Sequence, residues 1–128
     1  MGGPPSPAPV VWIVDADPVE ARRLADDLTA HAVSVTTFAS GDEMLYRAHQ
    51  ERPSLVVADV RLGDMSGTEL VGLLRAAGVR APVVMTARAH GDELEIRARA
   101  AGIVHFAVKP VEVESLLQIL WRTVAEEL

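Results

Sequence analysis

The segment LVVADVRLGDMSG at residues 55–67 contains the pattern on which the fold prediction depends. Its first four residues form a short, continuous apolar run, which is typical of a buried strand. Asp59 follows this run directly, and Ser66 with Glu69 then matches the capping box that begins many helices. The segment therefore predicts a buried strand, a polar loop and an amphipathic helix in immediate succession.

The same succession occurs five times along the chain. Strands are expected at residues 10–14, 33–38, 55–58, 82–85 and 103–108, and helices at about 18–31, 41–52, 67–78, 92–101 and 113–128. Apolar strands that alternate with helices predict a parallel sheet covered by helices on both faces and wound right-handed. We therefore expect an α/β fold in which residues 10–128 form one domain, a length sufficient to close a single hydrophobic core.

Composition argues against several classes of function. The chain has no cysteine, which excludes disulfides, thiolate metal sites and thiol catalysis. Its formal net charge of −6 argues against a direct nucleic-acid surface, because phosphate binding requires a basic face. No apolar run approaches the roughly 20 residues that cross a bilayer, so we expect a cytoplasmic protein without membrane contact. The opening MGGPPSPAP, residues 1–9, is expected to be a disordered leader.

Four polar residues stand where the expected strands end. Asp15, Asp59, Thr86 and Lys109 follow the first, third, fourth and fifth strands. In a parallel α/β sheet the functional crevice lies beyond the carboxyl ends of the strands, so we expect these residues to meet there. Lys109 is also the only lysine among twelve Lys and Arg residues, whereas the abundance of arginine is attributed to composition.

Such a crevice would have a definite chemistry. Two carboxylates repel each other, and a hard divalent cation such as Mg²⁺ relieves that repulsion. A carboxylate beside Mg²⁺ can attack a phosphoryl group and form an aspartyl phosphate, while a lysine and a hydroxyl bind the phosphoryl oxygens. In the structural alternative, Asp15 and Asp59 merely cap the helices that follow them.

Four segments resemble, in order and spacing, the signature of two-component response-regulator receiver domains. They are VDADP (14–18), LVVADVRLGDMSG (55–67), VVMTA (83–87) and HFAVKP (105–110). The VRxxxMSG pattern is similar to that of receivers coupled to helix-turn-helix output domains. The resemblance implies a flavodoxin-like three-layer sandwich, whose doubly wound five-stranded parallel sheet has the strand order 2-1-3-4-5.

The resemblance also implies roles for individual residues. Asp59 would be the phosphoacceptor, Thr86 the hydroxyl that binds the phosphoryl group, and Lys109 the ion-pair partner of that group. Thr86 and Phe106 would form a switch pair, in which the aromatic ring moves inward as the threonine moves toward the phosphate. The bond between Lys109 and Pro110 is expected to be cis.

The implied ligands of Mg²⁺ are Asp15, Asp59 and the backbone carbonyl of Arg61. One member of the acidic pair that is usual in the family is missing, because Ala16 follows Asp15. We therefore expect a weakened Mg²⁺ site. Asp17 is an additional candidate ligand, since residues two apart on an extended strand point the same way.

The implied function is that of a signalling switch and not of an enzyme. A sensor histidine kinase or a phosphotransfer protein would donate the phosphoryl group. The added charge of roughly −1.5 to −2 would shift a two-state equilibrium on the face formed by the fourth helix, the fifth strand and the last helix. That face would bind an output domain or a second copy of the chain.

Two other functions stay open at this point. The missing acid at Ala16 favours a receiver-like interaction module that does not use phosphorylation. The DADPV motif at residues 15–19 also fits the opening of haloacid-dehalogenase-type phosphatases, with Asp15 as nucleophile and Asp17 as general acid. Against that reading, no flap is expected after the first strand, and no acidic metal pair in a suitable context follows Lys109.

Overall fold

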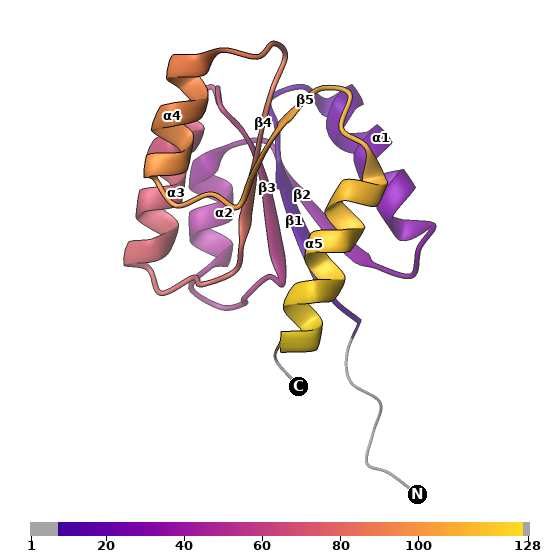
Figure 1. Cartoon of the computed structure of the whole chain (residues 1–128). Helices are drawn as coiled ribbons and strands as arrows, with labels where there is room; N and C mark the ends of the chain where they lie inside the picture. Colours follow the sequence, from indigo (N-terminus) through magenta and orange to yellow (C-terminus); the bar gives the residue numbers. More distant parts are fainter. Residues whose placement is uncertain (1–7, 127–128) are drawn as a thin grey trace, which may run out of the picture.

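The structure, a computed structural model that describes residues 8–126, contains a five-stranded parallel sheet with the order β2-β1-β3-β4-β5 (Figure 1). The strands are β1 (Val10–Val14), β2 (Ser34–Phe38), β3 (Leu55–Asp59), β4 (Val83–Ala87) and β5 (His105–Val108). The helices are α1 (Pro18–Thr29), α2 (Gly41–Arg47), α3 (Gly67–Ala76), α4 (Asp92–Ala100) and α5 (Val113–Glu126). This topology confirms the predicted α/β fold. Residues 1–7 of the predicted leader and the last two residues of the predicted final helix lie outside the described residues.

Helices cover both faces of the sheet, with α1 and α5 on one side and α2, α3 and α4 on the other (Figure 1). Neighbouring residues of a strand point to opposite faces, so each strand contributes to two cores. Ile13 of β1 belongs to the same core as Leu24 of α1 and Leu116 of α5. Trp12 belongs to the opposite core, together with Leu70 of α3. Burial on both faces explains why the strands read as continuous apolar runs.

Serine side chains begin two of the helices. Ser40 Oγ accepts a hydrogen bond from the N–H of Glu43 at 3.2 Å, and Ser66 Oγ accepts one from the N–H of Glu69 at 3.0 Å. The carboxylate of Glu43 also reaches back and accepts from the N–H of Ala39 at 3.1 Å. Both predicted helix starts are confirmed. Within residues 8–126, no helix is long and apolar enough to cross a lipid bilayer.

Two boundaries differ from the sequence prediction in ways that matter for packing. The sequence predicts that the second helix ends near Arg52, but α2 ends at Arg47. The residue before Pro53 is disfavoured in helical conformation, and the Arg52 guanidinium donates instead to the carbonyl of Ala48. The fourth strand starts and ends later than predicted, so Thr86 lies within β4 and not beyond it.

Two neighbouring leucines of α3 provide a test of the core. Leu74 is fully buried, whereas Leu73 is 46% exposed. Leu74→Ala should lower the free energy of unfolding by about 2–5 kcal/mol, because it removes apolar contacts and leaves a cavity. Leu73→Ala makes the same chemical change on the same helix and should cost less than about 1 kcal/mol. Urea denaturation followed by circular dichroism measures both losses, and equal losses would contradict this packing of α3.

Candidate functional site

The four polar residues that the sequence predicts at the strand ends lie along one edge of the sheet. Asp15 follows β1, Asp59 ends β3, Thr86 lies in β4, and Lys109 follows β5. Because all five strands are parallel, these positions share the carboxyl edge of the sheet. A pocket of about 680 Å³ opens at this edge, and both Asp15 and Asp59 line it.

Lys109 joins the two carboxylates directly. Its Nζ donates to Oδ2 of Asp15 at 2.7 Å and to Oδ2 of Asp59 at 2.5 Å. The three side chains have exposed fractions of 11%, 6% and 12%, in the order Lys109, Asp15 and Asp59. The fold thus gathers residues up to 94 positions apart into one nearly buried ion cluster. The peptide bond between Lys109 and Pro110 is cis, as predicted.

Burial and charge act in opposite directions within this cluster. Burial raises the pKa of the Asp15 carboxyl, and the negative charge of Asp59 adds to the rise, although hydrogen bonds from Lys109 and from the Asp17 N–H work against it. Burial alone would lower the pKa of Lys109. The hydrogen bonds and charges of Asp15 and Asp59 outweigh burial, so the pKa of Lys109 is raised. The lysine therefore carries its charge at neutral pH.

The backbone holds the second oxygen of each carboxylate. Oδ1 of Asp15 accepts from the N–H of Asp17 at 2.9 Å, and Oδ1 of Asp59 accepts from the N–H of Arg61 at 2.8 Å. Each carboxylate is thus fixed on one side by the chain two residues later and on the other by Lys109. This arrangement sets the orientation of both carboxylates before any ligand arrives.

Gly67 packs closely against the loop that follows Asp59. A Cβ atom on Gly67 would lie 2.4 Å from the backbone oxygen of Asp59, a distance that would force the backbone to shift. The N–H of Gly67 also donates to the carbonyl of Val60 at 2.9 Å. The glycine eight residues after Asp59 is therefore required by the close approach of α3 to the end of β3.

Asp17 has a structural task that the sequence prediction did not assign to it. Its carboxylate is the N-cap of α1 and accepts from the N–H groups of Val19 at 3.0 Å and Glu20 at 3.4 Å. Asp17 lines the pocket, but its Oδ1 already accepts hydrogen bonds from the first turn of α1. The proposed compensation for Ala16 by Asp17 stays a hypothesis, and its main competitor is this capping interaction.

The donor set does not fit a divalent cation well. Within the part of the chain that the structure describes, no three His, Cys, Asp or Glu residues gather closely enough to hold a metal ion. The two carboxylates that remain, those of Asp15 and Asp59, already hydrogen-bond to the Lys109 ammonium. Because Ala16 supplies only a methyl group at this edge, a cation would find few free anionic oxygens.

Thr86 and Phe106 lie next to the cluster on neighbouring strands. Thr86 is the register partner of Asp59, so the two side chains leave the same face of the sheet. Thr86 pairs on its other side with Ala107, which places the ring of the adjacent Phe106 on the opposite face. Thr86 is 2% exposed and Phe106 is 7% exposed. The switch roles predicted for this pair stay predictions.

Sequence reasoning missed two arginines at the pocket and a histidine that contacts Phe106. Arg61 and Arg88 line the pocket, although the sequence prediction attributed the arginines to composition and gave Arg61 only a carbonyl role. His90 lies over Phe106, with ring centroids 6.3 Å apart in an edge-to-face arrangement. The available signal was position, since Arg88 follows Thr86 by two residues and Arg61 follows Asp59 by two.

The sequence of this chain is similar to that of a known protein family and of characterised regulatory proteins. Residues 11–121 match the profile of the response regulator receiver domain family. The chain is 31% identical over 107 residues to the probable transcriptional regulatory protein TcrX of Mycobacterium tuberculosis, a match that covers 84% of this chain and 46% of TcrX. The chain spans less than half the length of the curated relatives it matches.

Two solved structures are similar in fold. The chemotaxis response regulator CheY4 of Vibrio cholerae has a TM-score of 0.80 and 27% identity, and the match covers 91% of this chain and 99% of CheY4. A response regulator of Burkholderia pseudomallei with a phosphorylated aspartic acid has a TM-score of 0.78 and 25% identity, covering 93% of this chain and 72% of that protein.

The pKa of Asp15 predicts an unusual dependence of stability on pH. Because folding raises this pKa, the stability that Asp15 contributes is fully present below its ordinary pKa of 3.8 and is lost as pH rises through the folded value. Relative to the parent, Asp15→Asn should therefore gain stability as pH increases from roughly 3 to 7. Urea unfolding at a series of pH values measures the difference.

Asp64 provides a control of opposite sign. Hydrogen bonds from the N–H groups of Asp42 and Gly41 lower its pKa, so its contribution is present above 3.8 and is lost as pH falls. Asp64→Asn should therefore lose stability relative to the parent over the same rise in pH. Differences that run in the same direction for both variants would show that the burial of Asp15 does not control its titration.

Proposed function

This chain belongs to the response regulator receiver domain family, and we propose that Asp59 accepts a phosphoryl group from a sensor histidine kinase or a phosphotransfer protein. One observation carries the proposal: the Nζ of Lys109 lies 2.5 Å from Asp59 Oδ2 at the mouth of a pocket on the carboxyl edge of the sheet. A carboxylate held beside a fixed ammonium is arranged to attack a phosphoryl group and to keep the product oxygens neutralised.

The transfer uses groups that are already in position. An oxygen of Asp59 forms the new bond to phosphorus as the bond between phosphorus and the donor imidazole nitrogen breaks, and that nitrogen keeps the electron pair. The N–H of Arg61 and the ammonium of Lys109 orient the carboxylate before the reaction. After transfer, Lys109 pairs with phosphoryl oxygens and stays bonded to Asp15, which limits the cost of the added charge.

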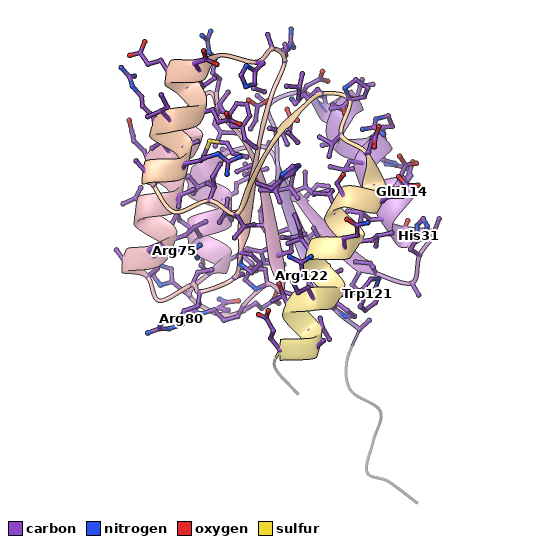
Figure 2. All side chains as sticks on the ribbon, in the orientation of Figure 1. His31, Arg75, Arg80, Glu114, Trp121 and Arg122 are labelled. Atoms are coloured by element: carbon purple, nitrogen blue, oxygen red, sulfur yellow. The ribbon has the colours of Figure 1, made fainter. Side chains whose placement is uncertain are left out.

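Phosphorylation would act on the surface through Thr86 and Phe106. In the proposal Thr86 moves toward the phosphoryl oxygens and the ring of Phe106 on the neighbouring strand moves inward, which shifts the face of α4, β5 and α5 between two states. Each of the three elements carries an exposed apolar side chain, namely Ile96 on α4, Val108 on β5 and Trp121 on α5. Trp121 projects from α5 in Figure 2. We propose that an output domain or a second copy of the chain binds there.

The metal prediction is not carried into this mechanism. Receiver domains typically bind a divalent metal, and Mg²⁺ at Asp15, Asp59 and the carbonyl of Arg61 stays a prediction for this chain. Two carboxylates that already bind Lys109 make a poor site for a hard cation. No step above is therefore assigned to a metal ion.

An interaction module without phosphorylation is the second candidate function. Ala16 favours it, and so does the ion cluster, because both carboxylates already bind Lys109 without any ligand. The phosphatase alternative is disfavoured, since α1 begins at Pro18 without an inserted flap and Asp17 caps that helix.

Labelling with a small phosphodonor distinguishes the two candidate functions. The purified chain is incubated with acetyl phosphate and Mg²⁺, and intact mass spectrometry then measures the protein beside Asp59→Ala and the control Asp64→Ala. We expect one phosphoryl group on the parent and on Asp64→Ala and none on Asp59→Ala, because Asp59 lines the pocket and contacts Lys109, whereas Asp64 binds the N–H groups of Gly41 and Asp42 instead. An unmodified parent at every Mg²⁺ concentration would support the interaction module.

The missing acid can be restored to test the metal site. Ala16→Asp adds a carboxylate beside Asp15 at the pocket, so Mg²⁺ affinity should increase by about tenfold or more. Isothermal titration calorimetry with MgCl₂ measures the change, and Ala89→Asp, at another position that lines the pocket, serves as the control. Equal affinities in the parent and Ala16→Asp would show that position 16 does not face the cation.

A further inference from the structure

The arginines divide into two groups by their contacts. Of twelve Lys and Arg residues one is lysine, which leaves eleven arginines. Seven of them bind neighbouring carboxylates or backbone carbonyls; these are Arg22, Arg23, Arg47, Arg52, Arg75, Arg97 and Arg99. Within residues 8–126, the side chains of Arg61, Arg80, Arg88 and Arg122 have no such partner. Two of these four, Arg61 and Arg88, line the pocket at Asp59.

The two pocket arginines follow neighbouring strands, Arg61 in the loop after β3 and Arg88 in the loop after β4. The backbone N–H of Arg61 is bonded to Asp59 Oδ1 at 2.8 Å, which fixes the base of this side chain beside the carboxylate. Arg88 follows Thr86 by two residues, and Thr86 is the register partner of Asp59 on the neighbouring strand. Both arginines therefore stand in loops that border the carboxylate, and neither guanidinium group has an acidic partner among the described residues.

The charges of the pocket balance without a cation. Its carboxylates are those of Asp15, Asp17 and Asp59. The two arginines and Lys109, which bridges Asp15 and Asp59, supply three positive charges. Mg²⁺ would leave this neutral rim with excess positive charge, and it would find no group of three acidic or histidine ligands among the described residues. An entering phosphoryl group, in contrast, would find two guanidinium groups free to pair.

We infer that Arg61 and Arg88 bind the phosphoryl oxygens at Asp59 and take over the charge neutralisation that a divalent cation supplies elsewhere in the family. The inference rests on the proposed function and deepens it, because it makes anion binding at this site largely independent of Mg²⁺. A guanidinium group is planar, always charged and suited to two parallel hydrogen bonds with phosphate oxygens. Two such groups carry the same formal charge as one divalent ion.

Binding of inorganic phosphate in EDTA tests the inference without requiring phosphotransfer. The backbone amide signals of Thr86 and Arg88 in NMR spectra of the full chain report the titration. We expect the parent to bind phosphate with the same affinity in EDTA and in Mg²⁺, and the double variant Arg61→Gln/Arg88→Gln to bind about tenfold more weakly or worse. The glutamines keep polar side chains of similar length, so the loss reports on charge.

The two other arginines without partners provide a matched control. Figure 2 shows Arg80 near the amino-terminal edge of the sheet and Arg122 on the later turns of α5, both away from the carboxyl edge. The double variant Arg80→Gln/Arg122→Gln changes net charge by the same amount and should bind phosphate like the parent. If both double variants bound phosphate equally weakly, the loss of affinity would follow from the change in net charge alone, and the inference would be overturned. Phosphate binding by the parent that requires Mg²⁺ would overturn it too.

Acetyl phosphate labelling separates this inference from the proposed function. We expect Asp59 to be labelled in EDTA at a rate within about tenfold of the rate in Mg²⁺, and Arg61→Gln/Arg88→Gln to lose most of the labelling in EDTA. Labelling of the parent in Mg²⁺ alone would refute the inference and leave the phosphoacceptor function standing. No labelling in either buffer, with phosphate binding still dependent on the two arginines, would refute phosphotransfer and keep the anion site.

Discussion

The contact of the Lys109 ammonium with the carboxylates of Asp15 and Asp59 is the interaction on which the site depends. It joins the ends of β1, β3 and β5, three segments that no local hydrogen bond could bring together. Two nearly buried carboxylates would repel each other without this cation, and one of them would then tend to take up a proton. The lysine therefore offsets the charge of both carboxylates in a largely desolvated position.

The parallel sheet is what made this site predictable from sequence. Its strands appear as short apolar runs because helices bury both faces, and the carboxyl ends of parallel strands must share one edge. The sequence alone therefore assigns the polar residues directly after such runs, Asp15, Asp59 and Lys109, to one crevice. The serine caps at Ser40 and Ser66 were predictable for a similar reason, since they depend on residues only three positions apart.

Features that depend on long-range packing could not be predicted in this way. After the early end of α2, Arg52 donates to the carbonyl of Ala77, which lies 25 residues away in the sequence. The capping role of Asp17 competes with a metal-ligand role, and both use the same residue at the same spacing. Whether Arg61 and Arg88 have acidic partners depends on the neighbours that tertiary folding supplies. Composition alone gave no reason to separate these two arginines from the other nine.

The substitution at Ala16 and the two pocket arginines have a common physical meaning. A site with an additional acid carries excess negative charge, so it needs a bound cation before it can bind an anionic ligand. A site with one acid fewer and two unpaired guanidinium groups is neutral before the ligand arrives. Phosphorylation of Asp59 would convert its carboxylate to an acyl phosphate, a mixed anhydride, and place charge on the phosphoryl oxygens instead. In the proposed mechanism Lys109 and the arginines follow that charge over a short distance, and the rearrangement that reaches Thr86 would begin with the redistribution of hydrogen bonds around a single aspartate.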